Sequence, residues 1–355
     1  MKILIVKTSS LGDIIHAFPV LQHLRKCYPD AQIDWVVEED FAPLVEAHPY
    51  LNQAIKINTK KWRKSFLKKE VRHEFKQFRQ KLQLSHYDLL IDLQANLKSG
   101  LINSLVTSSK KVGFGARTVH EWPNLFFTTH RYNPLPGKNI REDYLYLAQS
   151  VTGNFSQEIK GIKLNLSEAD QQKVNKNRAH LNLNGNGPVV MVCTGSNWPN
   201  KQLGKETLLV FLSLIASNLN SRFIFVWGNE EERQVSEELA KKIPGKACVA
   251  EKMGLAALQN LMADVDLVLA MDSLPLHLVA TTPTPIYSVF GASSAAKFKP
   301  SGESHEAFQG VCPFGKTFVK RCSILRTCST GACVKDIEAE KLFHHFNQFV
   351  IRLKW

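Results

Sequence analysis

The chain has 355 residues, 44% of them hydrophobic, which is enough for two domains that each bury a core. Its formal net charge of +13 predicts an acidic partner: nucleic acid, an anionic membrane or a phosphorylated substrate. No stretch approaches about 18 consecutive apolar residues and no signal-peptide pattern opens the chain, so we expect a cytoplasmic protein. The seven cysteines are odd in number, which argues against a disulfide framework.

The first residues combine a strand pattern, a polar turn and a helix pattern. Residues 3–6 are aliphatic, as in a parallel strand buried on both faces. Small polar residues follow from Lys7 to Asp13, and apolar residues then recur at helical spacing from Ile14 to Leu24, so Asp13 is expected at or near a helix N-cap. Open α/β sheets bind ligands at such loops. We therefore predict that this loop forms half of the active site.

Strand and helix patterns alternate through the next 130 or so residues, as in a doubly wound parallel sheet. Further strands are expected at 32–37, 53–57, 87–91 and 110–114. Helices are expected at 38–47, 98–106 and 140–151, and an aromatic- and proline-rich loop at 120–138.

Residues 56–81 are strongly basic, with aromatic residues between the cations. An amphipathic helix with a solvated basic face is the plain interpretation. Binding of phosphate groups or of an anionic membrane surface is the functional one. No RNA- or DNA-binding motif is visible, which weakens a nucleic-acid role.

A cluster of Asn, Gly and Pro at 182–188 is the strongest signal of a domain boundary, and the alternation of strand and helix patterns begins again after it. Strands are expected at 189–192, 222–226, 248–249, 266–270 and 285–290, and helices at 206–219, 230–242, 255–263 and around 277–281. This predicts an α/β protein with two Rossmann-like domains, residues 1–180 and 181–335, whose parallel sheets face a central cleft, the arrangement called GT-B. The closing helix, within 336–355, is expected to pack back onto the first domain.

Three loops of the second half contain side chains suited to binding a ligand. Residues 194–201 offer hydroxyls, backbone N–H groups and an ammonium to a phosphate, although an ordinary polar loop has the same composition. The second loop is residues 227–233. Its Glu230 would either interact favourably with the dipole of the helix that begins there or bind ribose hydroxyls. In the third, Asp272 is suited to cap a helix, Ser273 to receive a phosphate, and His277 to face either the core or the cleft.

Several segments together resemble the bacterial lipopolysaccharide heptosyltransferases of glycosyltransferase family 9, with heptosyltransferase I the most similar branch. They are KTSSLGDIIHAFPVL, WVVEEDFA, KKWRKS, the loop ending at Lys201, WGNEEER and MDSLPLHLVA, in order from residue 1 to about 302. The resemblance implies inverting, metal-independent transfer of heptose from ADP-heptose, bound by the C-terminal domain, to the Kdo region of lipid A, bound by the N-terminal domain. It implies no cofactor and a place on the inner face of the cytoplasmic membrane.

The resemblance also implies a role for individual residues. Asp13 matches the general base, which takes the proton of the attacking hydroxyl. The donor side is matched by Thr194, Ser196, Asn197, Lys201, Glu230, Asp272, Ser273, Leu274 and His277. The acceptor side is matched by Ser10, Lys60, Arg63, Lys64 and Lys98. Leu274 departs from the family pattern, which has glycine at that place.

Four cysteines cluster near the end of the chain, at 312, 322, 328 and 333. Their spacing is not the paired C-x-x-C of zinc ribbons, so we expect a reduced structural loop and no metal. Other readings of the whole chain are a family 9 transferase with another sugar or acceptor, a non-catalytic sugar-nucleotide binder, and a basic nucleic-acid-binding protein.

Overall fold

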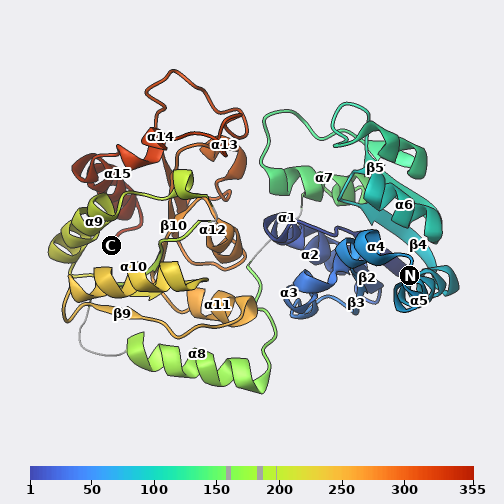
Figure 1. Cartoon of the computed structure of the whole chain (residues 1–355), viewed down its shortest axis with the longest axis horizontal. Helices are drawn as coiled ribbons and strands as arrows, with labels where there is room; N and C mark the ends of the chain where they lie inside the picture. Colours follow the sequence, from blue (N-terminus) through green and yellow to red (C-terminus); the bar gives the residue numbers. More distant parts are fainter. Residues whose placement is uncertain (157–160, 182–186, 197) are drawn as a thin grey trace. The chain divides into compact units, whose positions relative to one another are not determined.

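In the computed structural model, residues 1–156, 161–181, 187–196 and 198–355 are described. The chain forms two compact units, residues 1–159 and 160–355. Each contains one six-stranded sheet in which all pairings are parallel, with helices on its faces (Figure 1). Within the described ranges, no helix has both the length and the apolar character needed to cross a bilayer.

The first unit has the strand order β3-β2-β1-β4-β5-β6. Its strands are β1 (Lys2–Val6), β2 (Gln32–Glu38), β3 (Gln53–Ile57), β4 (His86–Asp92), β5 (Thr107–Phe114) and β6 (His130–Tyr132). Its α-helices are α1 (Leu11–His16), α2 (Phe18–Cys27), α3 (Ala42–Glu46), α4 (Thr59–Ser65), α5 (Lys69–Leu84), α6 (Leu97–Leu105) and α7 (Ile140–Thr152). Short 3₁₀ turns occur at η1 (Glu39–Phe41) and η2 (Trp122–Phe127).

The second unit has the order β12-β11-β10-β7-β8-β9. Its strands are β7 (Val189–Cys193), β8 (Arg222–Val226), β9 (Ala247–Val249), β10 (Leu267–Met271), β11 (Ile286–Phe290) and β12 (His305–Gln309). Its helices are α8 (Glu168–Leu181), η3 (Pro199–Lys201), α9 (Lys205–Leu219), α10 (Glu230–Lys241), α11 (Leu255–Met262), α12 (Leu274–Val279), α13 (Ala295–Phe298), α14 (Ala332–Lys335) and α15 (Ala339–Arg352).

Numbered within its own unit, each sheet has the order 3-2-1-4-5-6, that of a Rossmann fold. The order reverses between β1 and β4 in the first sheet and between β7 and β10 in the second. In such sheets the crevice beyond the carboxyl ends of these two strands binds the ligand. The topology therefore selects two loops in each unit as the places to look for a site.

The central strands are buried because they are covered on both faces. β1, β7, β10 and β11 have apolar runs that are almost wholly inaccessible to solvent. In the second unit the core extends from β7 and β10 to α9 and α15.

Two expectations about the domains are corrected by the structure. Residues 161–181 belong to the second unit, because Ile162 N donates to Thr281 O at 2.7 Å and Asn260 Nδ2 to Leu164 O at 3.0 Å. The junction therefore precedes residue 161, and the Asn/Gly/Pro cluster follows α8 inside the second unit, with residues 182–186 outside the described part. The closing helix α15 also packs in the second unit, where the rings of Phe346 and Phe211 meet at 5.6 Å.

Smaller differences concern two predicted helical segments that are each divided in two and two strands that the sequence did not predict. The first predicted helix is two helices that meet at Ala17, and the basic segment is likewise divided into α4 and α5. Strand β6 lies inside the predicted loop 120–138, and β12 has no predicted counterpart. Both are short edge strands with few apolar residues, so hydrophobic patterning does not reveal them.

Candidate active site

Asp13 lies in the loop and first helical turn that follow β1, at the switch point of the first sheet. Helix α1 begins at Leu11 with Ser10 as its N-cap, so Asp13 is the third helical residue rather than the cap. Its Oδ2 accepts hydrogen bonds from Ser10 N at 3.2 Å and Ser10 Oγ at 2.7 Å. The carboxylate is thus held by a neighbour that is itself exposed.

The loops after β1 and β4 are joined by Gln94, which sequence reasoning missed. Its Oε1 accepts from Thr8 N at 3.0 Å, Thr8 Oγ1 at 3.2 Å and Ser9 N at 3.1 Å. The buried Asp92 carboxylate in turn accepts from Gln94 N at 2.9 Å and from Ser99 Oγ at 2.8 Å. These bonds fix the segment that carries Ser10 and Asp13.

Lys7 is a buried cation beneath this loop. Its Nζ lies 5.0 Å from the centroid of the Tyr144 ring, and the residue is 3% exposed. Burial lowers the pKa of Lys7, and the nearby Asp13 and Asp92 carboxylates oppose that change. Burial also raises the pKa of Tyr144 well above its usual value, and the Asp13 charge adds to this. Asp13 therefore lies next to a buried region that contains the Tyr144 ring and the Lys7 ammonium, and its charge acts on both groups.

Glu38, at the end of β2, connects the predicted acceptor residues. Its Oε1 accepts from Lys98 Nζ at 3.0 Å, and its Oε2 accepts from Thr59 N, at the start of α4, at 3.1 Å. Lys60, Arg63 and Lys64 are exposed along α4, and Lys60 lies 3.8 Å from Asp40. The structure thus brings Lys98 to the helix that carries the other three cations through a carboxylate that sequence reasoning did not select.

On the second sheet, the predicted donor residues Lys201 and Asp272 form a buried ion pair across its switch point. Ser293, after β11, donates to the same Asp272 oxygen, and His277 Nε2 lies 3.9 Å from the other. Burial alone would raise the pKa of Asp272, but the charges of Lys201 and His277 and the hydrogen bonds from Lys201 and Ser293 hold it below its usual value. Asp272 is therefore an anion that orients the Lys201 ammonium.

The remaining donor residues surround this pair. Thr194 directly follows β7 and is 8% exposed, with an Oγ1 that has no hydrogen-bond partner among the described residues. Ser273, not Asp272, is the N-cap of α12, and Leu274 is the first residue of that helix. Ser196 O accepts from Gln202 Nε2 at 2.7 Å, which shapes the loop after β7. Asn197 lies outside the described residues.

Glu230 and Glu232 differ in their surroundings at the start of α10. Glu230 is exposed and lies 3.4 Å from Arg233. Glu232 Oε2 accepts from Gly228 N at 2.7 Å, and a Cβ built on Gly195 would meet Glu232 Oε1 at 2.0 Å. Glu232, which sequence reasoning missed, thus joins the loops after β7 and β8, because Gly195 leaves room for its carboxylate.

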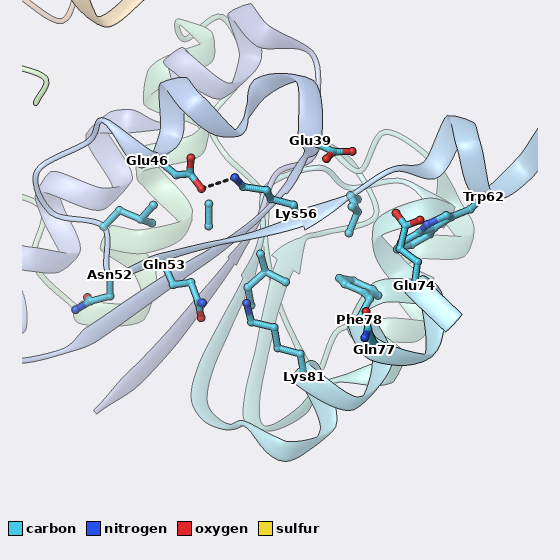
Figure 2. Close-up of a pocket in the computed structure, with 14 residues that line it drawn as sticks. Glu39, Glu46, Asn52, Gln53, Lys56, Trp62, Glu74, Gln77, Phe78 and Lys81 are labelled. Carbon is cyan, nitrogen blue, oxygen red and sulfur yellow. Dashed lines mark ion pairs between the residues drawn. The ribbon is translucent and has the colours of Figure 1, made fainter. Parts of the chain in front are cut away.

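A pocket of about 690 Å³ lies along the edge strand β3. Figure 2 shows Lys56 of β3 turned toward Glu46, with which it pairs at 2.9 Å, and Trp62 and Phe78 at the other end. None of the predicted site residues that the structure describes lines it. Among the residues that the structure describes, no group of three or more His, Cys, Asp and Glu side chains could hold a metal ion.

Comparisons with known proteins agree with this architecture. The family model for glycosyltransferase family 9 (heptosyltransferase) matches residues 75–327. Lipopolysaccharide heptosyltransferase 1 of Pseudomonas aeruginosa is 27% identical over 330 residues, covering 91% of this chain and 88% of the relative. A structure of Escherichia coli heptosyltransferase WaaC with ADP superposes with a TM-score of 0.77 at 23% identity, over 98% of this chain and 100% of that one. A second structure of this enzyme, with ADP-2-deoxy-2-fluoro heptose, superposes with a TM-score of 0.70 at 25% identity, over 88% of this chain and 94% of that one.

The fold and the family predicted from the sequence are thereby confirmed. Two Rossmann-like domains with parallel sheets are the α/β architecture of the GT-B heptosyltransferases. Since the family model spans well over half of the sequence, the chain belongs to glycosyltransferase family 9, the heptosyltransferases, and is a glycosyltransferase.

Proposed function

We propose that this glycosyltransferase moves heptose from ADP-heptose to the Kdo region of the lipid A inner core, with inversion and without a catalytic metal. The observation that carries the proposal is the Asp13 carboxylate, held by Ser10 at the switch point of the first sheet. The relatives support it, since they are named lipopolysaccharide heptosyltransferase 1 and two solved structures contain ADP or an ADP-heptose analogue.

Asp13 serves as the general base in this proposal. A hydroxyl of the acceptor attacks the anomeric carbon of the donor, its proton passes to the Asp13 carboxylate, and the bond to ADP breaks with its electron pair going to the diphosphate oxygen. One displacement of this kind inverts the anomeric carbon. Proton removal by a positioned carboxylate contributes on the order of 10²- to 10⁴-fold in rate.

The second unit binds the donor, and Lys201 takes the place of a metal. Its ammonium, oriented by Asp272, faces the diphosphate together with Thr194, Ser196 and the backbone at the start of α12. Asn197, which lies outside the described residues, is proposed as a donor ligand from the sequence alone. Ser273, Leu274 and His277 complete this side, and the Glu230 carboxylate binds the ribose hydroxyls.

The first unit binds the acceptor, which is polyanionic. Lys60, Arg63 and Lys64 lie on one short helix, and Lys98 is joined to it through Glu38. Together with Ser10 they suit the carboxylate of Kdo and the phosphates of lipid A. A nucleic acid is not needed to explain the net charge.

The region between α4 and α5 suits peripheral binding to the inner face of the cytoplasmic membrane. Phe66 is 47% and Leu67 91% exposed, and Lys64, Lys68 and Lys69 beside them are exposed as well. Apolar side chains among lysines bind anionic lipid surfaces. Leu67→Ser should weaken sedimentation with phosphatidylglycerol vesicles, whereas the distant and equally exposed Leu84→Ser should not.

The test of the reaction is transfer from ADP-heptose to Kdo-capped lipid A in the presence of EDTA. Wild type should form product of inverted anomeric configuration, and Asp13→Ala should lose roughly 10²-fold or more in kcat. Asp30→Ala, at an exposed carboxylate outside the site, is the matched control. No product from wild type, with ADP still raising its melting temperature, would contradict the substrate assignment and direct attention to other sugars or acceptors.

A further inference from the structure

Gln94 lies at the switch point of the first sheet, in the turn between β4 and α6 (Figure 1). Its side-chain Oε1 accepts three hydrogen bonds, from Thr8 N at 3.0 Å, Thr8 Oγ1 at 3.2 Å and Ser9 N at 3.1 Å. A backbone N–H can only donate, so the atom that meets Thr8 N and Ser9 N has to be the amide oxygen. The orientation of the Gln94 amide is therefore determined, and its NH₂ group is the end that these two residues do not use.

The NH₂ group of Gln94 remains available to a ligand. Nε2 donates to none of the residues that the structure describes, and the side chain is only partly buried. Ser9, whose N–H binds the other end of the amide, directly precedes Ser10, and Ser10 holds the Asp13 carboxylate through its N–H and its hydroxyl. Two unused N–H donors thus lie beside the segment that carries the proposed general base.

The buried carboxylate of Asp92 holds the turn that places Gln94. Its Oδ1 accepts from Gln94 N at 2.9 Å and from Ala95 N at 3.0 Å. Ala95 has a φ of +60°, a left-handed conformation that is unfavourable for a residue with a Cβ. The other oxygen, Oδ2, accepts from three side chains at 2.7–2.8 Å, those of Ser99, Asn103 and Asn124. These bonds hold an unfavourable turn in place, so the Gln94 amide is positioned before a ligand binds.

We propose that Gln94 binds the acceptor sugar, donating from Nε2 to one of its oxygen atoms, a carboxylate or a hydroxyl oxygen. The inference rests on the proposed function, in which the attacking hydroxyl has to lie within hydrogen-bond distance of Asp13. A sugar held there presents further oxygen atoms to the neighbouring loops, and Kdo carries a carboxylate as well as hydroxyls. Lys98, one of the proposed acceptor cations, lies four residues after Gln94 on α6. Gln94 is therefore adjacent both to the segment of the general base and to the helix that carries Lys98.

The amide of Gln94 has a different task from the cations of the acceptor side. Lys60 and Lys64 are exposed on α4, and an ammonium on a flexible chain attracts an anion without fixing its orientation. An amide held by three hydrogen bonds instead constrains where one acceptor oxygen lies, and so decides which hydroxyl faces Asp13. Gln94 is thus a specificity-determining contact to the acceptor.

Gln94→Glu separates binding of the acceptor from support of the loops. The carboxylate keeps an oxygen for Thr8 N and Ser9 N, so the melting temperature and the Kd of ADP should stay near those of wild type, but it has no N–H to donate. The Kd of deacylated Kdo-capped lipid A, measured by calorimetry, should rise about tenfold or more. Gln80→Glu adds the same charge at an exposed glutamine of α5 and should bind this acceptor within about twofold of wild type.

Gln94→Met removes the N–H donors without adding a charge. It also loses the three bonds to Thr8 and Ser9, so its melting temperature should fall, and its Kd for the acceptor should again rise about tenfold. Acceptor analogues identify the oxygen atom, one lacking the Kdo carboxylate and others lacking single Kdo hydroxyls. The difference between wild type and Gln94→Met should disappear with the analogue that lacks the partner of Nε2.

Wild-type affinity of Gln94→Glu for the acceptor would overturn the inference and leave Gln94 as a structural link between two loops. A loss in Gln94→Met that persists with every analogue would lead to the same conclusion. The titration of wild type keeps these outcomes apart from a failure of the proposed function. Wild type that binds ADP but not Kdo-capped lipid A would contradict the proposed acceptor, and the assignment of Gln94 with it, whereas normal binding and transfer by wild type and by Gln94→Glu would reject the role of Gln94 alone.

Discussion

The Lys201 ammonium and the Asp272 carboxylate are paired with only 8% and 6% of their side chains exposed. The pair joins the loop after β7 to the loop after β10, the two strands between which the sheet order reverses. A buried pair contributes little net stability, but loss of one partner leaves the other charge buried and alone. The same two side chains are proposed donor ligands, so stability and donor binding have to be measured separately.

Lys201→Met should lower the free energy of unfolding by about 3–5 kcal/mol, because Asp272 then stays buried without its partner. The double variant Lys201→Met/Asp272→Leu should regain much of that stability and still fail to bind ADP tightly. Urea unfolding measures the first quantity and calorimetry the second. Equal stability of the single and double variants would show that the pair does not hold the loops together.

Sequence patterns were sufficient for the fold because the central strands are buried on both faces and the strands and helices alternate. They failed where packing rather than local pattern decides. Helix α15 is amphipathic wherever it packs, and nothing in its sequence shows that Phe346 meets Phe211. The residues that the sequence missed, Glu38 and Gln94 among them, act through partners more than 20 residues away in the chain.

His48 should make stability depend on pH. It is 1% exposed against Phe18, and burial lowers its pKa to about 3. The unfolded chain takes up a proton near pH 6.5 and the native state does not, so this contribution is complete above about pH 6.5 and declines as the pH falls toward 3. Its full loss amounts to about 5 kcal/mol.

Urea unfolding of wild type and His48→Gln at a series of pH values measures this effect. Between pH 6.5 and 4, unfolding of the variant should take up as much as about one proton fewer than unfolding of wild type, so its free energy of unfolding should change less steeply with pH. His73→Gln, at an exposed histidine of α5, should keep the slope of wild type. An unchanged slope in His48→Gln would mean that another buried group takes up the proton.

Substitutions of Glu230 and Glu232 should affect different properties, ligand binding for Glu230 and loop stability for Glu232. Glu230→Gln should raise the Kd of ADP about tenfold, the loss of one charge-assisted hydrogen bond to ribose, with little change in melting temperature because the side chain is exposed. Glu232→Gln should lower the melting temperature, because Gly228 N then loses its carboxylate acceptor. Calorimetry and thermal unfolding of both variants distinguish the roles, and the reverse pattern would move ribose recognition to Glu232.

Glu38→Gln should weaken acceptor binding without affecting the donor. The carboxylate pairs with Lys98 and also accepts from Thr59 N, so its neutralisation frees a proposed acceptor cation and loosens the start of α4. We expect the KM for Kdo-lipid A to rise about tenfold, in line with a charged hydrogen bond between partly buried groups, while the KM for ADP-heptose stays within about twofold. Glu46→Gln is the matched control, because that carboxylate pairs with Lys56 of β3, away from the predicted ligands. If both variants raise the KM for the acceptor equally, the effect is general to the charge of this unit, and Glu38 does not position the acceptor site.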